Sequence, residues 1–448
     1  MNPSEFRQRD AQAPACVDRL RACLARADAA PGDIGTAWLA RRDAAALAEA
    51  RAWDASIGRG AIDAPLAGLV MTVKACFDCD GWVTHAGSRV LADMPPARTD
   101  AALVAALRRA GAVPVAQTAM TEFAYGALGV NRAYGTPATP LDARRERVAG
   151  GSSSGAAVSV ALGAADLSVG SDTSGSARIP AAFCGVAGFK PSRGRYPDAG
   201  MRFLSTTFDV PGMLAATADL CRQVDAALCG RTVERAAPAP ARVDALHFIV
   251  PERFATEDVD PAVGQAFDAW LSRLSRLGAR IERKRLDCLA EAGAVARAGG
   301  IIAAEAFMLH RAQLETAADR YDPLVGPRIA AGEHVRAHDY AAALRRLAVL
   351  ADAYRAELGD AHAVLTPTVP MPPPCIADLA DERVYLAENA RAFRLTEFAN
   401  RLDLPSISVP GERRRKLPIG LLLTGHRGDD ARLLDAAVLV ERALAAAE

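Results

Sequence analysis

Residues 150–176 read GGSSSGAAVSVALGAADLSVGSDTSGS, and they place two loops rich in glycine and serine around a helix and a strand. The helical run covers 156–163, and the apolar strand candidate covers 167–170. Glycine permits backbone conformations that are closed to other residues, so both loops can turn tightly and present N–H groups inward. A loop, a helix and a strand in this order predict one unit of an α/β sheet.

The flanking sequence extends this alternation in both directions. An apolar run at 69–73 ends at Lys74, and a helix is expected over 100–110, with Asp100 as its N-cap. The other expected elements are helical faces at 17–24 and 45–53, strands at 112–116, 246–250, 363–366, 407–409 and 419–424, and helices at 262–277, 293–318, 337–358 and from 429 onward. Because strands lie near both ends, we predict one sheet whose halves come from distant sequence.

A single large α/β domain is the preferred organisation of the 448 residues, although this length also allows about three average domains. The expected parts are an N-terminal helical segment at 1–60, a catalytic core at 66–230, a variable helical region at 231–360, and C-terminal strands with a helix at 361–448. The Pro/Ala stretch at 236–241 is the candidate for a surface crossover between two of these parts.

Charge gives no sign of a nucleic-acid or membrane partner. Lysine plus arginine number 53 and aspartate plus glutamate number 53, so the formal net charge is zero. The main local exception is the basic run 413–416, which is interpreted as a solvated hairpin tip between two apolar stretches. No apolar stretch is expected to reach the roughly 20 residues that span a bilayer.

The cysteine content favours a cytoplasmic protein with reduced thiols. The chain has nine cysteines, an odd number, and its N-terminus is polar and lacks a secretory apolar region. Cys76 and Cys79 have C-x-x-C spacing, but no second pair and no suitably spaced histidine accompanies them. We therefore interpret them as packing residues and expect no metal site.

A serine in these loops would need a base, because a hydroxyl is a weak nucleophile. Seven histidines occur, and none is singled out by its position. Lys74 is the better candidate, since burial at the end of an apolar strand would lower its pKa, although Asp78 could oppose that shift. The alternatives are that Lys74 extends from the strand end to solvent and that the loops are ordinary flexible loops.

The stretch 151–155 also satisfies G-x-S-x-G, the nucleophile elbow of α/β-hydrolases, with Ser153 at its centre. That motif requires a buried strand directly before it, whereas 142–147 is highly charged. The elbow therefore remains only a competing interpretation. No Gly-Lys-Ser/Thr follows at the spacing of a phosphate-binding loop, so that interpretation is excluded.

Longer stretches of the sequence resemble the amidase signature enzymes. The matching stretches are 72–74, 121–126, 150–155, 171–176, 179–185, 188–191, 365–368 and 404–408. The likeness covers most of the chain and is weakest over about 230–360. It implies the fold of that family, a single large domain with a mixed central β-sheet covered by helices on both faces.

The resemblance also implies a catalytic group of two serines and a lysine. Ser176 matches the family nucleophile, Ser152 matches a bridging serine held by a cis peptide bond, and Lys74 matches the base. The oxyanion-hole loop of the family corresponds to the backbone N–H groups of Thr173, Ser174, Gly175 and Ser176. Ser153, the centre of the elbow pattern, has no part in this group.

Four residues near these loops either depart from the family pattern or support the loops. Ser174 stands where many members have glycine, and Ala149 stands where many have proline. We expect Asp172 to hold the loop by hydrogen bonds, as aspartate does in turns. For Arg178, a structural role is favoured over contact with a substrate carboxylate.

The function implied is an amidohydrolase that cleaves a carboxylic or ureido-type amide of a small molecule through a Ser176 acyl-enzyme. The alternative is the catalytic subunit of a glutamine-dependent tRNA amidotransferase. That subunit's usual Ala-Arg-Tyr-Asp-Gly stretch is missing here, and the nearest match, at 319–323, ends in proline. A non-catalytic scaffold is the third hypothesis, and the presence of all three catalytic residue types argues against it.

The expected partner is a small-molecule amide, with no cofactor, metal, nucleic acid or membrane, and a homodimer is left open. Tyr125, Leu128 and Asn131 are the candidate substrate contacts. Glu305 and His310 lie on an expected helix and could belong either to the pocket or to the core.

Overall fold

The structure is a computed structural model that describes residues 15–58, 64–229, 240–411 and 419–445. These residues form one mixed sheet of 11 strands in the order β1-β3-β2-β4-β6-β5-β10-β11-β9-β7-β8. The strands are β1 (Trp38–Arg41), β2 (Val70–Lys74), β3 (Val113–Thr118), β4 (Leu167–Asp172), β5 (Ala187–Lys190), β6 (Val210–Ala215), β7 (His247–Pro251), β8 (Arg280–Lys284), β9 (Ala363–Pro367), β10 (Ser406–Pro410) and β11 (Gly420–Thr424).

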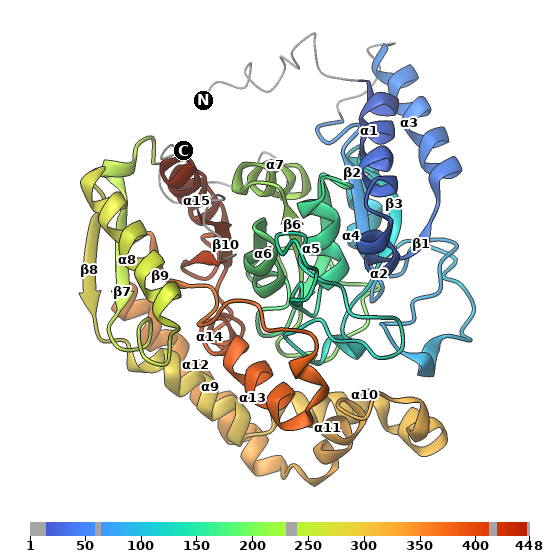
Figure 1. The fold of residues 1–448 in the computed structure, drawn as a ribbon. Coiled ribbons are helices and arrows are strands. Elements are labelled where there is room, and N and C mark those ends of the chain that lie inside the picture. Colours follow the sequence, from blue (N-terminus) through green and yellow to red (C-terminus); the bar gives the residue numbers. More distant parts are fainter. Residues whose placement is uncertain (1–14, 59–63, 230–239, 412–418, 446–448) are drawn as a thin grey trace.

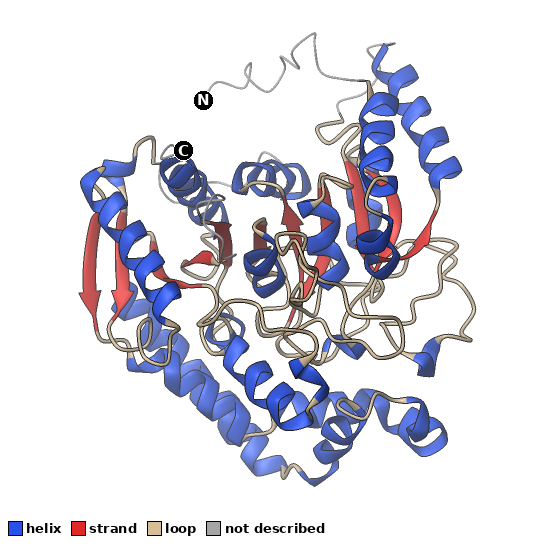
Figure 2. Ribbon diagram, in the orientation of Figure 1, coloured by secondary structure: helices blue, strands red, loops and turns tan. Residues whose placement is uncertain are grey.

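Helices cover both faces of this sheet (Figure 2). They are α1 (Cys16–Asp28), α2 (Pro31–Ala37), α3 (Asp43–Gly58), α4 (Ala102–Arg109), α5 (Ser154–Ala161), α6 (Arg178–Cys184), α7 (Ala218–Cys229), α8 (Pro261–Arg276), α9 (Asp287–Ala298), α10 (Ile301–Ala317), α11 (Gly326–Ala330), α12 (Ala337–Leu358), α13 (Glu382–Phe393), α14 (Glu397–Arg401) and α15 (Asp430–Ala445). In Figure 1, α9 to α13 gather along the lower side of the sheet. The fold class expected from the resemblance is confirmed.

The two halves of the sheet meet where β5 lies between β6 and β10. β2 pairs in parallel with β3 and β4, as the strand–helix–strand alternation predicted. β5 is antiparallel to both of its neighbours, and Phe189 on β5 faces Ile407 on β10 in the register. Strands more than 200 residues apart are therefore adjacent, which confirms the prediction of one sheet assembled from distant sequence.

Burial on both faces follows from the alternation of side chains along the strands. On β11, Leu421 and Leu423 belong to one hydrophobic cluster, whereas Leu422 belongs to another. Val70 and Met71 on β2 divide in the same way between two clusters. Near-continuous apolar runs are typical of strands that are covered on both sides, which is why these segments were recognisable in the sequence.

Three expectations about elements need correction. Asp100 does not cap α4, whose N-cap residue is Ala101; the Asp100 carboxylate instead accepts hydrogen bonds from Asp80 N at 2.9 Å and Arg108 Nη1 at 2.6 Å. The helix expected over 293–318 is two helices, because Gly300 has a φ of 59° and breaks the run. The strands β1, β5, β6 and β8 were not expected at all.

Two interpretations concern residues outside the described ranges. The basic run at 413–416 lies wholly in the gap between β10 and β11, which pair as antiparallel neighbours. The Pro/Ala crossover at 236–241 lies mostly in another such gap, since 230–239 is not described.

The expectation that no apolar segment reaches membrane length also needs correction. Asp287–Arg320 is a helical stretch of 34 residues that is long and apolar enough to cross a membrane by length and composition. The helix α9 within it packs against α12 through a cluster that includes Leu289 and Leu347. A core helix meets the same test, so the stretch is weak evidence for a span.

Truncating a side chain where the halves of the sheet meet is expected to destabilise the whole domain. Phe189→Ala removes a fully buried ring and should lower the free energy of unfolding by about 3–5 kcal/mol. Val349→Ala on α12, where the side chain is 55% exposed, is the control and should change it by less than about 0.5 kcal/mol. Urea denaturation followed by circular dichroism measures both, and equal effects would contradict this account of the core.

Candidate active site

Lys74 is the last residue of β2, and its side chain is fully buried. Its Nζ donates hydrogen bonds to Ser152 Oγ at 2.7 Å and to Ser171 Oγ at 2.9 Å. The alternative that Lys74 extends to solvent is therefore wrong. Parallel neighbours β2 and β4 end at the same edge of the sheet, which brings Lys74 to the loop that follows β4.

Burial lowers the pKa of Lys74, because the charged ammonium loses its hydration. Cys76, Asp209 and Asp172 oppose this shift by their charge. Asp78, which was expected to oppose it, instead accepts a hydrogen bond from Thr84 Oγ1 at 2.5 Å. The amine is thus held in surroundings that favour its neutral, proton-accepting form.

Ser152 lies just before α5, in a tightly packed turn. The peptide bond between Gly151 and Ser152 is cis, as the resemblance implied. A Cβ on Gly151 would lie 2.5 Å from Gly129 N, so no larger residue fits there without moving the backbone. The carbonyl of Ser152 accepts a hydrogen bond from Thr121 N at 3.1 Å.

Ser176 lies in the loop after β4, and its side chain is 1% exposed. Its Oγ has no hydrogen-bond partner among the described residues. Its carbonyl accepts from Ser153 N at 3.1 Å, which ties the two glycine- and serine-rich loops together. The structure therefore brings Lys74, Ser152 and Ser176 into one buried region, with an unengaged hydroxyl on Ser176.

Asp172 holds this loop by hydrogen bonds, as expected. Its carboxylate accepts from Gly175 N at 2.8 Å and from Ala177 N at 3.1 Å. Gly175 has a φ of 141°, and a Cβ there would lie 2.3 Å from Thr396 Oγ1, so this position requires glycine. The Gly175 N–H is engaged by Asp172, which corrects its assignment to the oxyanion hole and leaves Thr173, Ser174 and Ser176 as candidate donors.

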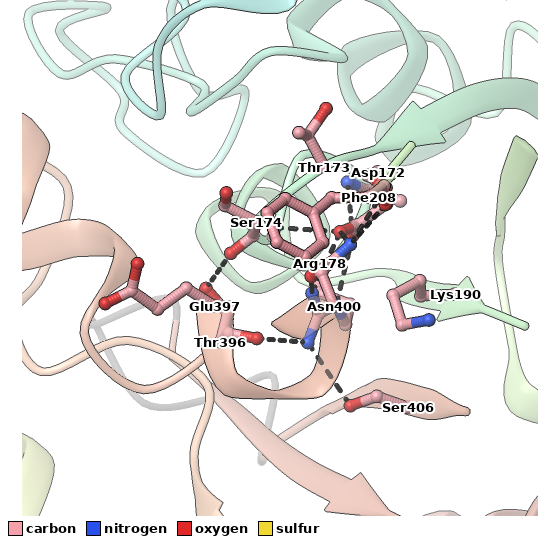
Figure 3. Close-up of polar contacts among 12 residues, drawn as sticks. Asp172, Thr173, Ser174, Arg178, Lys190, Phe208, Thr396, Glu397, Asn400 and Ser406 are labelled. Carbon is pink, nitrogen blue, oxygen red and sulfur yellow. Dashed lines mark hydrogen bonds and ion pairs between the residues drawn. The ribbon is translucent and has the colours of Figure 1, made fainter. Parts of the chain in front are cut away.

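A buried ion pair supports the loop from below. Arg178 donates to Asp172 through Nε at 3.0 Å and through Nη2 at 2.9 Å, and both side chains are fully buried. Figure 3 shows the Arg178 guanidinium also directed at Asn400 and Thr396, with hydrogen bonds of 2.7 Å and 2.9 Å. Burial alone would raise the pKa of Asp172, but Arg178 lowers it to about 2. These contacts give Arg178 a structural role.

A pocket of about 270 Å³ opens beside Ser176. Its walls come from the loop after β4 and from α9, α10, α13 and α14. The lining residues are Ala124, Tyr125, Thr173, Ser174, Ser176, Leu204, Ala296, Arg297, Gly300, Ile302, Ala303, Arg328, Asn389, Ala390, Phe393, Glu397 and Arg401.

The three candidate substrate contacts are placed differently with respect to this pocket. Tyr125 lines it, and the Arg328 guanidinium stacks on the Tyr125 ring at 3.9 Å. Leu128 is fully buried and is not among the lining residues. The Asn131 amide nitrogen donates to Gly87 O and to Met120 O, both at 2.8 Å, so its side chain supports the backbone.

Glu305 and His310 both serve the core. The Glu305 carboxylate accepts hydrogen bonds from the hydroxyls of Ser205 and Tyr340, at 2.5 and 2.7 Å. His310 Nδ1 lies 3.0 Å from the hydroxyl of Tyr321, and burial lowers the pKa of His310 to about 4. Neither residue lines the pocket beside Ser176.

Sequence reasoning missed the contribution of α14, whose residues contact the loop after β4. Thr396 Oγ1 donates to Ser174 O at 2.6 Å, and Asn400 Nδ2 donates to Asp172 O at 2.9 Å. The only signal in the sequence was that α14 immediately precedes the matching stretch 404–408. In the part of the chain that the structure describes, no group of three His, Cys, Asp or Glu side chains is arranged to hold a metal ion.

The fold and the site together define a class: α/β enzymes in which serine hydroxyls lie beside a buried lysine. Comparison with known proteins narrows that class. A family model described as Amidase matches residues 18–434. The chain therefore belongs to the amidase family, and it is a hydrolase that acts on carbon–nitrogen bonds.

Individual relatives agree with this assignment. A 2-amino-5-chloromuconic acid deaminase of Comamonas testosteroni is 37% identical over 403 residues, which cover 89% of this chain and 86% of the relative. One of the subunits of the glutamyl-tRNA(Gln) amidotransferase of Aromatoleum aromaticum is 33% identical, with 88% and 86% covered. A solved structure described as an amidase has a TM-score of 0.86 at 30% identity and covers 98% of this chain and 99% of its own.

Removing the cation from the buried pair should destabilise the loop more than removing both charges. Arg178→Met leaves Asp172 charged and buried, and should lower the free energy of unfolding by about 3–5 kcal/mol. The double variant Asp172→Asn/Arg178→Met should be less destabilised than Arg178→Met alone, because no uncompensated charge remains. Urea denaturation of the three proteins measures this. A double variant as unstable as Arg178→Met would show that charge compensation is not the main contribution.

Proposed function

We propose that this enzyme hydrolyses an amide of a small molecule through a covalent acyl-enzyme on Ser176, with Ser152 as proton relay and Lys74 as base. The observation that carries the proposal is the 2.7 Å hydrogen bond from the buried Lys74 Nζ to Ser152 Oγ, beside a Ser176 hydroxyl that lacks a partner among the described residues. A weak nucleophile becomes reactive when a base stands within reach of its proton. Lysine can serve as that base once burial favours its neutral form.

In the first half of the reaction, Ser176 Oγ attacks the amide carbonyl carbon while its proton passes through Ser152 Oγ to Lys74 Nζ. The carbonyl oxygen becomes an oxyanion, which the N–H groups of Thr173, Ser174 and Ser176 are placed to stabilise. One well-placed donor of this kind contributes about 3–4 kcal/mol to the transition state. The Asp172 carboxylate keeps the loop in shape by holding Gly175 N and Ala177 N.

In the second half, the carbon–nitrogen bond breaks and Ser152 returns a proton to the departing nitrogen. Ammonia or an amine leaves, and the acyl group remains on Ser176 Oγ. Water then attacks the acyl carbon, and its proton follows the same relay through Ser152 to Lys74. Bond cleavage at the Ser176 ester oxygen releases the carboxylic acid and restores the hydroxyl.

The size of the pocket supports a small substrate. Its volume of about 270 Å³ lies just below the roughly 300–1,000 Å³ that is usual for pockets that hold drug-sized ligands. The name of the Comamonas relative gives a small molecule, 2-amino-5-chloromuconic acid, as what that protein acts on. We extend to this chain only the class of small nitrogen-containing molecule.

The amidotransferase alternative is not favoured by the comparisons, because such proteins are similar to this chain at lower identity than the deaminase is. The residues at 319–323 have structural contacts: Arg320 donates to Arg89 O at 2.5 Å, and Asp322 N donates to Glu122 Oε2 at 2.8 Å. The proposal also keeps a cytoplasmic setting and a cofactor-free reaction. The first is supported by Cys76 and Cys79, which remain thiols despite their close spacing.

Ser176→Ala should lower amide hydrolysis by about 10⁴-fold or more, since no acyl-enzyme can form. Ammonia release from a panel of small aliphatic, aromatic, ureido and dicarboxylic amides measures the loss. Phenylmethylsulfonyl fluoride should add one sulfonyl group to Ser176, detected by peptide mass spectrometry. Ser153→Ala is the matched control, because the nucleophile-elbow alternative would place the reactive hydroxyl there. Normal turnover by Ser176→Ala would contradict the proposal.

Activity should fall as the pH is lowered through the pKa of Lys74, because a protonated amine cannot accept the serine proton. Burial lowers that pKa from its ordinary value of 10.5, so the fall should begin at a lower pH than for an exposed lysine. Below the pKa, kcat/KM should decrease about tenfold per pH unit. The same shift makes the free energy of unfolding rise with pH between the folded pKa and 10.5, since the unfolded state binds the extra proton there.

Ammonia release measured from pH 5 to 10 tests this dependence. Lys74→Met should remove most of the activity at every pH. Wild-type turnover that is independent of pH, or a Lys74→Met variant with the wild-type profile, would exclude lysine as the base.

A further inference from the structure

Positive charge predominates in the pocket beside Ser176. Its described lining includes three arginines, Arg297, Arg328 and Arg401, and one carboxylate, Glu397. Aspartate and lysine are absent from that lining. The excess of guanidinium groups needs an explanation, because buried cations without partners are costly.

Arg401 is the most deeply buried of the three arginines, with 6% of its surface exposed. Its Nη1 donates to Thr173 O at 3.1 Å, and its Nη2 donates to Ser174 Oγ at 2.8 Å. Its guanidinium carbon lies 4.4 Å from the centre of the Phe208 ring. Arg401 therefore reaches from α14 to the side of the loop that carries the candidate oxyanion donors.

Glu397 does not neutralise this group fully, because two guanidiniums share its carboxylate. Its Oε1 accepts from Arg297 Nη1, and its Oε2 lies 3.3 Å from Arg401 Nη2. Arg297 lies on the rim, with its side chain 64% exposed. One carboxylate thus faces two cations, and the cation buried further inside receives the longer contact.

Two further observations indicate that Arg401 is incompletely compensated. Its Nε has no hydrogen-bond partner among the described residues, although the atom is buried. Burial also lowers the pKa of Arg401, and the attraction of Glu397 opposes that shift only in part. A guanidinium used only to hold the loop would be expected to satisfy its buried donors. An anion in the adjoining pocket would supply the missing charge.

We propose that Arg401 determines specificity by recognising a carboxylate on the substrate, so that this enzyme prefers amides that also carry a carboxylate group. The inference rests on the proposed function, because it concerns the pocket beside Ser176. A guanidinium suits this task because it is planar, always charged and able to donate two parallel hydrogen bonds to one carboxylate. The pocket has room for both ends of a small half-amide, at about 270 Å³.

Ser174 links this recognition to the reaction site. Its hydroxyl accepts the Arg401 hydrogen bond, and its backbone belongs to the loop that ends at Ser176. A carboxylate held at Arg401 would therefore fix the substrate relative to the nucleophile. Holding a substrate in the reactive orientation is itself a large contribution to catalysis.

Binding of matched ligand pairs tests the proposal without turnover. The protein is the full chain with Ser176→Ala, and the ligands are half-amides of dicarboxylic acids with two to six carbons, from oxamate to adipamate. Each half-amide is compared with its neutral diamide by isothermal titration calorimetry. At least one half-amide should bind about tenfold or more tightly than its diamide, because a charge-assisted hydrogen bond replaces a neutral one.

Adding Arg401→Gln should abolish that preference, and Arg401→Lys should restore part of it. Arg391→Gln is the matched control, because Arg391 lines a neighbouring cavity and not this pocket, and its preference should remain. Glu397→Gln removes the competing carboxylate and should increase the preference, which keeps a test available if Arg401→Gln does not fold.

Equal binding of every half-amide and its diamide would overturn the proposal, as would an unchanged preference in Arg401→Gln. These results would leave the proposed function standing, because labelling of Ser176 by the neutral phenylmethylsulfonyl fluoride does not depend on a carboxylate. Conversely, a carboxylate preference lost in Arg401→Gln would support Arg401 as the specificity residue even if Ser176 failed to react.

Discussion

The buried ion pair between Asp172 and Arg178 is the interaction on which the site depends. Asp172 ends β4 in the N-terminal half of the chain, and Arg178 also binds Asn400 on α14 in the C-terminal half. The pair therefore joins the loop that carries Ser176 to the opposite part of the domain. Because both charges are buried, neither can be removed alone without leaving the other uncompensated. The loop keeps its shape only while both halves of the sheet are in place.

Burial has a second consequence at the end of β2. Lys74 lies in a strand that is covered on both faces, so its ammonium cannot regain hydration by extending to solvent. The hydroxyls of Ser152 and Ser171 are the partners that its Nζ has. The same packing that stabilises the sheet thus prepares a neutral amine beside a hydroxyl. In this way the core of the domain and the proposed chemistry depend on one physical cause.

The limits of prediction from sequence can be seen in particular residues. The strand that ends at Lys74 was predictable, because 69–73 is a continuous apolar run. The engaged N–H of Gly175 was not, since it depends on where the Asp172 carboxylate points within the folded loop. Asn131 looked like a pocket residue but binds Gly87 and Met120 backbone. The strand β5 escaped notice because its four residues, two of them Gly188 and Lys190, carry little strand signal.

By itself, the sequence determined the family, the α/β class and the residue types of the candidate site. These follow from local patterns: apolar runs, glycine-rich loops and long matching stretches. Only the tertiary structure decided what surrounds them, because β5 and β10 pair across more than 200 residues and α14 then packs on the loop after β4. That packing buries Arg401 beside the pocket and gives Arg178 a structural role. No local pattern distinguishes these two arginines, since the difference lies in the partners that folding brings to each.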